Sequence, residues 1–520
     1  MIEKGLVLLL VSTVPCVLSA EETDRCTRVR PEIISVGEGA IQNAGCGPEI
    51  WRGGPSNGET RLVKTIVSVS DYAVNSMIRV KWSDYERAEG EYLFDTMDEH
   101  FAYCIQYGQK LNIGCFVTST NHGISIDDAL CAYPVYVHEA LQKSEDQDIK
   151  YTTSRGGITR WEPNFENDYF FERYDALLAA FAEYLDGSQT FEGRTIQRKK
   201  LVRYIEMRHF GFWGEGAYPK ALVPSNSACL IRFADAFAKH FPDIRLLVPT
   251  NGMVYSPDNY DTIVDYHFHL LNAKNNVGPF GIFRDNWGWD ENLSYVQKIY
   301  YEANKYEKDG VKLYALLRDR WKAAPLVGEP LQAVPKEGFR PYMHLLQQVK
   351  YLHPAVIRNC NVSSGTKWYG NPTGYNAYDD PQAMADFHAM YAIIGFRYLF
   401  TEAAITWSDD ELMVAVDWLN IGLTPTYDEW HVQYIIKDQA GKEIWSGRSS
   451  LDLRTLFPNE NTPPGVVSAD DATAHTDRFT DVPKAGRLYL QIVDPCGVSP
   501  PMALSIKGRT EKGRYLLAEK

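Results

Sequence analysis

The chain has 520 residues, which is longer than one ordinary domain, so two or three domains are expected. Hydrophobic residues make up 45% of it and aromatic residues 13%, which is enough for a large packed core and excludes global disorder. Its 67 acidic residues outnumber 53 basic ones and give a net charge of -14. This balance argues against nucleic acid as a partner, because phosphate backbones recruit cationic surfaces. The aromatic content fits core burial and a sugar-stacking surface equally well.

The first 20 residues predict an export signal. Lys4 precedes an apolar run that ends at Ser19-Ala20, directly before two glutamates. This is the pattern of a cleavable signal peptide, and the run is too short to span a bilayer. We therefore expect a secreted, periplasmic or cell-surface protein without a membrane span. Export permits disulfides, and Cys26 with Cys46 is the simplest pairing, although spacing does not fix the connectivity.

From about residue 60 to 360, short apolar strands alternate with amphipathic helices, as in a parallel sheet built from βα units. The periodic segment 170–185 is the clearest of the expected helices. Eight strand positions predict a (β/α)8 barrel, an α/β fold, and the segment 263–269 competes for one of them. The expected strands are 62–69, 76–82, 111–118, 201–209, 244–249, 280–286, 325–329 and 355–359.

The pattern changes after about residue 395. Apolar and polar residues alternate with period two in segments 397–407, 411–420, 429–437 and 487–493, whereas 458–476 has the composition of a long loop. Such alternation indicates an antiparallel β-sandwich. We therefore expect a catalytic barrel over 21–395 and a sandwich over 396–520. The sandwich is expected to pack against the barrel and to supply no catalytic carboxylate.

Two glutamates stand where barrel enzymes place their chemistry, at the carboxyl ends of strands. Glu215 follows the fourth expected strand in the sequence Phe-Trp-Gly-Glu-Gly, and Glu329 ends the seventh. Glycosidic cleavage needs one carboxyl to protonate the leaving oxygen and another to attack carbon or activate water. Each glutamate is alternatively an ordinary loop carboxylate, but glycine and aromatic neighbours are not typical of a solvated face. The pattern favours a glycosidase.

Glu206 and Arg208 are two residues apart on the fourth strand and therefore face the same way. We interpret them as an ion pair that orients Glu215. A buried structural pair, or Glu206 acting as the acid itself, are the alternatives.

Several further residues at strand ends are candidates for contact with substrate. Indole rings stack on the apolar faces of sugars, so at least two of the four tryptophans near strand ends are expected to line the cleft. The aspartate in this set is equally well explained as a turn cap. The candidates are Arg79, Trp82, Trp213, Asp285 and Trp287, and the fourth tryptophan is Trp289.

His267 and His269, two residues apart, are candidate metal ligands. On a strand, these two imidazoles would share a face and point to one ion. Barrel metallohydrolases place such a pair on the first strand, and no further histidine or aspartate cluster completes this one. We therefore expect neither a metal nor another cofactor.

Four segments carry a resemblance to a known family. The second strand ends at Trp82 and is followed by Glu-Gly-Glu-Tyr at residues 89–92, and the others are 108–110, 161–168 and 212–215. Together they resemble a bacterial family of proposed glycoside hydrolases in clan A, related to the beta-galactosidase-like barrels. Its members carry a C-terminal sandwich with a strand followed by Asn-Ile-Gly, as at 420–422 here. The resemblance covers nearly the whole mature chain.

The resemblance implies hydrolysis of a poly- or oligosaccharide with retention, using Glu329 as nucleophile and Glu215 as acid/base. One position departs from the pattern, because clan A enzymes usually have Asn directly before the acid and this chain has Gly214. That departure favours the alternative of a non-catalytic carbohydrate-binding barrel. A metal-dependent hydrolase is the third reading. The sequence specifies neither the sugar, the linkage, the exo or endo mode nor the oligomeric state.

Overall fold

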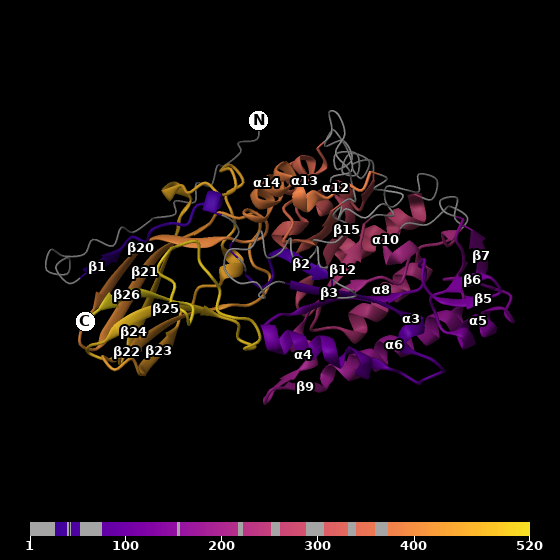
Figure 1. Cartoon of the computed structure of the whole chain (residues 1–520), viewed down its shortest axis with the longest axis horizontal. Helices are drawn as coiled ribbons and strands as arrows, with labels where there is room; N and C mark the ends of the chain where they lie inside the picture. The colour runs from indigo at the N-terminus through magenta and orange to yellow at the C-terminus, as the bar shows by residue number, and fades with distance from the viewer. Residues whose placement is uncertain are drawn as a thin grey trace, which may run out of the picture.

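The protein consists of a barrel and a pair of β-sheets that lie side by side along the long axis (Figure 1). The computed structural model describes residues 26–38, 41, 43–51, 75–152, 157–216, 222–250, 260–287, 306–330, 340–358 and 373–520. Among these residues, no helix is both long and apolar enough to cross a membrane.

Eight strands form a closed barrel, and each pairs in parallel with its neighbours. This confirms the predicted (β/α)8 fold. In chain order the strands are β2 (Gly47–Trp51), β3 (Asn75–Lys81), β4 (Leu111–Val117), β11 (Val202–Met207), β12 (Arg245–Pro249), β15 (Gly281–Trp287), β18 (Leu326–Pro330) and β19 (Val356–Arg358).

Seven barrel strands lie where the sequence predicted them, and the first does not. The segment 62–69 lies outside the described residues, and β2 takes the first position. The sequence of β2 is Gly-Pro-Glu-Ile-Trp, which has neither an apolar run nor a clean alternation. A strand of this kind gives no periodic signal and is recognised only by its partners.

Helices surround the barrel. The helix expected over 170–185 is α6, and its first turn is capped by the side chain of Asn167, which accepts a hydrogen bond from the Phe170 amide. The α-helices of the described residues are α3 (Trp82–Tyr85), α4 (Asp98–Tyr107), α5 (Val135–Leu141), α6 (Asp168–Asp186), α7 (Arg198–Leu201), α8 (Ala228–His240), α10 (Tyr260–Asn272), α12 (Leu313–Arg318), α13 (Pro341–Leu352) and α14 (Pro381–Tyr391).

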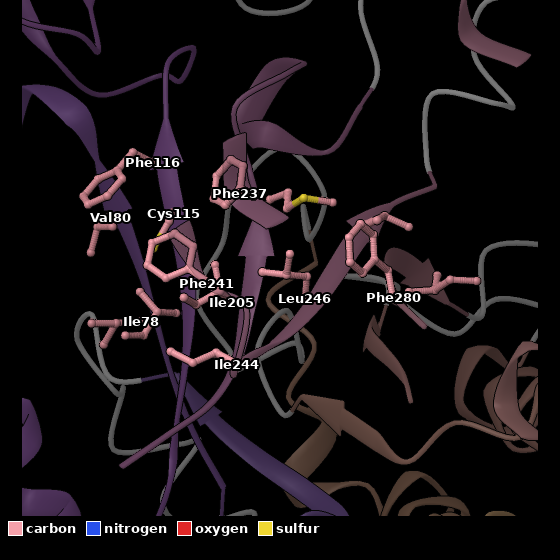
Figure 2. Close-up of a cluster of buried hydrophobic side chains, with 14 of the residues drawn as sticks. Ile78, Val80, Cys115, Phe116, Ile205, Phe237, Phe241, Ile244, Leu246 and Phe280 are labelled. Atoms are coloured by element: carbon pink, nitrogen blue, oxygen red, sulfur yellow. The ribbon is translucent and has the colours of Figure 1, made fainter. Parts of the chain in front are cut away.

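The main hydrophobic core lies between strands and helices. Figure 2 shows Ile78 of β3 and Ile205 of β11 together with Phe237 of α8. All three side chains are at most 2% exposed. Burying one such side chain contributes about 1.5–3 kcal/mol, so this layer fixes the strands on which the site is built.

A small sheet is inserted between β4 and α6, and the sequence did not predict it. It consists of β5 (Ile124–Ile126), β6 (Ala129–Cys131), β7 (Ile149–Thr152) and β8 (Thr159–Glu162). Three further antiparallel pairs are β9 (Ser188–Phe191) with β10 (Arg194–Gln197), β13 (Lys274–Asn275) with β14 (Gly278–Pro279), and β16 (Glu307–Lys308) with β17 (Val311–Lys312).

The C-terminal part forms two four-stranded antiparallel sheets around a second core, as the period-two pattern predicted. The expected loop 458–476 ends earlier than predicted, because β24 begins at Thr473. One sheet contains β1 (Cys26–Val29), β20 (Tyr398–Trp407), β21 (Glu411–Asn420) and β24 (Thr473–Thr480). The other contains β22 (His431–Lys437), β23 (Glu443–Arg448), β25 (Arg487–Val493) and β26 (Arg514–Glu519).

The N-terminal strand β1 belongs to the sandwich, where Cys26 lies opposite Thr406 of β20. Cys46 lies directly before β2 and packs in the second core, beside Gly395, which precedes β20, and both cysteines are free thiols. The pairing of Cys26 with Cys46 is therefore wrong, because the two residues lie near opposite ends of β20.

The segment after β21 joins the two parts. Tyr427 belongs to the cluster that fills the lower barrel interior with Tyr204, Phe283 and Val356, and its hydroxyl donates to the carbonyl of Trp321 at 2.5 Å. Beside it, Arg203 Nε lies 2.8 Å from a carboxylate oxygen of Asp428. The sandwich thus closes the end of the barrel opposite the carboxyl ends of the strands.

Candidate active site

Charged side chains fill the barrel interior toward the carboxyl ends of the strands, above the apolar cluster around Tyr427. Side chains alternate along a strand, so residues two apart share the interior. This alternation places Glu206 above Tyr204 on β11 and Glu329 above Val327 on β18. The described charged and amide side chains of this layer are Glu49, Arg79, Asn112, Glu206, Arg208, Glu329 and Arg358.

Glu329 is surrounded by guanidinium groups. Its Oε1 accepts from Arg79 Nη2 at 2.9 Å and from Arg358 Nη1 at 2.8 Å, and Arg208 Nη2 lies 3.9 Å away. Its side chain is only 3% exposed. A buried carboxylate is costly unless it is paired, and these cations offset that cost. Glu329 is therefore held in one orientation at the end of β18.

Glu215 reaches the same arginines from the loop after β11. Its Oε1 lies 3.7 Å from Arg79 Nη1 and 4.0 Å from Arg208 Nη1. The side chain is 19% exposed, against 3% for Glu329. The carboxyls that follow the fourth and seventh strands thus share two guanidinium groups, and Glu215 is the more accessible of the two.

A strained loop fixes Glu215. Trp213 has φ 58° and ψ 14°, a left-handed conformation that is rare for a bulky side chain. Its amide donates to the carbonyl of Ser119 at 2.8 Å, and its carbonyl accepts from Arg208 Nη1 at 2.9 Å. Backbone strain of this kind persists only where the surroundings enforce it, which is characteristic of functional sites.

Gly214 explains the departure from the Asn-Glu pattern. Its φ is +68°, and a Cβ at this position would lie 2.3 Å from the Cβ of Arg208. No residue with a side chain fits here without moving the loop or the end of β11. The missing Asn is therefore a consequence of close backbone packing, and the carboxyl of Glu215 still reaches the interior of the barrel mouth.

Glu206 is fully buried beneath these groups. It accepts from Arg208 Nε at 2.5 Å and from Asn112 Nδ2 at 2.9 Å, and it forms an ion pair with Arg358. Such a carboxyl has no path to a substrate. Its contacts agree with the interpretation of Glu206 and Arg208 as a pair that orients Glu215, and they disagree with Glu206 as the acid.

Of the three candidate tryptophans that the structure describes, Trp213 is half-buried beside the site. Its ring lies 5.3 Å from Arg79 Cζ and 5.4 Å from the ring of His122. Trp82 is completely buried against Phe170 and Tyr174, which corrects its assignment to substrate binding, because a buried ring cannot stack on a sugar.

Trp287 requires the same correction, and Asp285 stays a prediction. Trp287 is 3% exposed, belongs to the hydrophobic core, and donates its Nε1 to the carbonyl of Arg284. Asp285 lies in β15, but its side chain is not among those described, and Trp289 lies outside the described residues.

The proposed histidine pair does not form a metal site. The segment 263–269 is helical, part of α10, and residues two apart on a helix do not share a face. His267 is buried, and its two ring nitrogens lie within hydrogen-bond distance of the carbonyl oxygens of Ile263 and Pro249. His269 points elsewhere, with its Nε2 2.7 Å from a carboxylate oxygen of Asp235. Among the described residues, no group of three or more potential ligands is placed to hold a metal ion.

Sequence reasoning missed Glu49, Asn112 and Arg358. Each contacts the charged layer from inside the barrel. Only Arg358 had a signal in the sequence, because it is a charged residue in the short apolar strand Val-Ile-Arg. Sequence reasoning also missed the contribution of the inserted sheet. Arg160 of β8 pairs with Glu162 and lies with its Cζ 4.0 Å from the ring of Phe212, so the insertion supports the loop that carries Glu215.

Comparison with known proteins gives only distant likenesses. No family model matches the chain, and no curated protein does. Among solved structures, endo-glycoceramidase II from Rhodococcus sp. is 13% identical with a TM-score of 0.40, covering 87% of this chain and 98% of that one. An endo-1,4-beta-xylanase from Caldicellulosiruptor owensensis is 12% identical with a TM-score of 0.33, covering 58% and 82%. Likenesses this distant assign no activity, which has to be argued from the site.

Proposed function

We propose that this protein is a glycoside hydrolase that cleaves O-glycosidic bonds with retention, using Glu329 as nucleophile and Glu215 as acid/base. One observation carries the proposal: Arg79 and Arg208 each contact both carboxyls, one from the loop after the fourth strand and one from the end of the seventh. A pair of carboxyls at one point, one buried and held by cations and one more exposed, is the arrangement that two-step glycoside hydrolysis uses.

The two carboxyls divide the reaction between them. Glu329 attacks the anomeric carbon while the bond to the leaving oxygen breaks, and Glu215 donates its proton to that oxygen. Water then loses a proton to Glu215 and attacks the same carbon, which releases the sugar and restores the Glu329 carboxylate. Retention requires the two carboxyls to be roughly 5–5.5 Å apart when substrate is bound, because a wider gap admits water directly.

Trp213 and Arg79 complete the proposed substrate contacts. The half-buried indole offers an apolar face beside the carboxyls, which suits the apolar face of a pyranose. A poly- or oligosaccharide is the proposed substrate class. Export of the chain after removal of residues 1–20 is part of this proposal, and the mass of the N-terminal peptide from the native host tests it.

The proposal is tested on a panel of aryl glycosides with the wild type and two variants. Glu329→Gln should abolish turnover while the protein stays folded, because the amide cannot form the glycosyl ester. Glu215→Ala should slow substrates with poor leaving groups by roughly 100-fold or more, and activated aryl glycosides far less, because only the former need protonation. Thermal unfolding of each variant checks that the fold is intact.

A matched control is Glu86→Gln. Glu86 is also a buried glutamate paired with an arginine, Arg173, but it lies outside the proposed site. The Glu86→Gln variant should be as active as the wild type. A chelator should leave the activity of the wild type unchanged. A folded wild type that hydrolyses no glycoside but binds oligosaccharides would favour the carbohydrate-binding barrel. Full activity of Glu329→Gln would end the assignment of the nucleophile.

A further inference from the structure

Arg358 occupies the centre of the charged layer. It comes from β19 and is completely buried, and each of its three guanidinium nitrogens contacts a different carboxylate. Nε lies 2.7 Å from Glu49 of β2, Nη1 lies 2.8 Å from Glu329 of β18, and Nη2 forms an ion pair with Glu206 of β11. One side chain therefore connects the first, fourth and seventh strands of the barrel.

Glu49 holds this arginine in place. It is 1% exposed, and its other oxygen lies 3.5 Å from Asn112 Nδ2, a contact at the limit of a hydrogen bond. Glu49 does not contact Glu329 or Glu215 directly in the described structure. Arg358 links Glu49 to Glu329, because it contacts both carboxylates. Arg79 and Arg208 in turn contact both Glu329 and Glu215, so Glu49 belongs to one connected layer of charges with the two carboxyls.

We propose that Arg358 and Glu49 are positioning residues that orient Glu329 and couple its charge to the proton on Glu215. The inference rests on the proposed function, since it gives these residues a task in that reaction. During the first step Glu329 loses its charge by forming an ester, and Glu215 gains one by giving up its proton. The arginine network contacts both groups, so it interacts with an unchanged total charge while that charge moves between them.

The charge of Glu49 is the part of this network that a substitution can remove cleanly. Glu49→Gln keeps the shape and an oxygen for Arg358. The side-chain oxygen of Asn112 is buried and has no hydrogen-bond donor among the described residues, so it can turn to accept from the new amide. Like charges that share a buried site disfavour one another's ionisation. Loss of the Glu49 charge should therefore favour ionisation of the remaining carboxyls, Glu206, Glu215 and Glu329.

The expected result is a shift of the pH profile of kcat/KM. In Glu49→Gln both limbs should move to lower pH by on the order of one unit, because Glu329 ionises more readily and Glu215 loses its proton more readily. At neutral pH the variant should keep most activity on activated aryl glycosides and lose it on substrates with poor leaving groups. Glu86→Gln, the buried pair outside the site, should leave the profile unchanged.

Arg358→Lys tests the positioning role separately. Lysine keeps the charge but cannot place donors on three carboxylates, so kcat should fall by roughly 100-fold with little change in KM. Two results together would overturn the inference. They are a Glu49→Gln enzyme that is slower at every pH without a shift of its pH profile, and an Arg358→Lys enzyme with unchanged kcat.

A measurement without substrate separates this inference from the proposed function. Carboxyl groups labelled with carbon-13 in glutamate are followed by NMR across the pH range, and Glu215 is assigned by its loss in Glu215→Gln. The Glu215 signal should titrate at lower pH in Glu49→Gln than in the wild type. An identical titration in both proteins would refute the coupling even if the enzyme is active, whereas a shift in a protein that hydrolyses no glycoside would refute the proposed function alone.

Discussion

Glu215 depends on two residues whose backbone lies in the left-handed region, Trp213 and Gly214. The first is held there by hydrogen bonds to Ser119 and Arg208, and the second allows the loop to lie directly on the end of β11. The strain lies directly before the proposed acid, so the conformation of this loop determines the position of the Glu215 carboxyl.

Gly214→Asn restores the residue that the clan A pattern has before its acid, and we predict that it inactivates the protein. The new Cβ would overlap Arg208, so the loop must move and carry Glu215 away from Arg79. We expect a loss of stability of about 1–3 kcal/mol and a large fall in kcat on substrates with poor leaving groups. Urea unfolding and steady-state kinetics measure the two effects.

Gly193→Asn is the matched control for this prediction. Gly193 also has positive φ, at +78°, but a Cβ there meets nothing within 4 Å, and its hairpin lies outside the proposed site. It should lose some stability and no activity. An active Gly214→Asn enzyme would show that the loop does not fix the position of Glu215.

Some residues of the candidate site could be predicted because they lie at the ends of strands with strong apolar patterns. The sequence singled out Glu215, Glu329 and Arg208 in this way, and the structure places them close together. Glu49 could not be predicted, because its strand is five residues long and contains Gly and Pro. Trp82 was predicted wrongly for a different reason. A residue at a strand end can turn its ring either toward the barrel mouth or into the helical layer, and Trp82 does the latter.

At the scale of elements, the end of β11 is tied to two helices by His209. Its ring stacks on Phe233 of α8 at 5.3 Å, and its Nε2 lies 3.0 Å from the hydroxyl of Tyr266 of α10. Burial lowers the pKa of His209 from 6.5 to about 3, because the charged ring would lose its hydration. The folded protein therefore keeps this imidazole neutral at neutral pH.

This burial predicts loss of stability in mild acid. The unfolded chain takes up a proton below pH 6.5 and the folded protein does not, so the stabilisation is complete above 6.5 and declines as pH falls toward 3. At pH 5 the loss from His209 is about 2 kcal/mol. The difference between the unfolding free energies at pH 7 and pH 5 should be smaller for His209→Gln than for the wild type.

Urea titrations at the two pH values measure that difference. Tyr351→Ala, which removes an exposed side chain of α13 that does not titrate in this range, serves as the control and should keep the wild-type difference. An unchanged difference in His209→Gln would mean that another group dominates the acid response.

Some of the elements could be predicted from the sequence and others could not. Strands with continuous apolar runs and the periodic helix α6 were predicted. The segment 263–269 alternates as a strand would, but it is the middle of a helix over Tyr260–Asn272 that packs on α8. The inserted sheet has strands of three or four residues, which are too short to show a period.

At the scale of the whole molecule, the sandwich contributes to the barrel by filling its floor with Tyr427. The neighbouring pair reinforces this contact. Burial alone would raise the pKa of Asp428, but the charges of Arg203, Lys110 and Arg245 outweigh it and hold that pKa below its usual value. Such a contact cannot be predicted from a local sequence pattern, because it depends on how the barrel and the sandwich pack together.

Tyr427→Ala is therefore predicted to destabilise the barrel, although the residue belongs to the C-terminal region. The cavity should cost about 3–5 kcal/mol, as for other buried aromatic residues. Tyr427→Phe keeps the ring but removes the hydroxyl and its hydrogen bond to Trp321, and should cost about 1 kcal/mol. Urea unfolding followed by tryptophan fluorescence measures both values.

The control for this prediction is Tyr351→Ala, on the exposed side of α13, which should change stability by less than about 0.5 kcal/mol. If Tyr427→Ala proved as stable as Tyr351→Ala, the sandwich would not support the barrel through this contact.

The central claim is that Glu329 forms a covalent bond to the sugar. The most direct measurement uses the activated 2-deoxy-2-fluoro analogue of whichever aryl glycoside the wild type hydrolyses, followed by digestion and mass spectrometry of the peptides. The account predicts one equivalent of fluorosugar on the peptide that contains Glu329, and none in Glu329→Gln. A sugar bound to a different residue, or hydrolysis that inverts the anomeric centre without any labelled peptide, would contradict it.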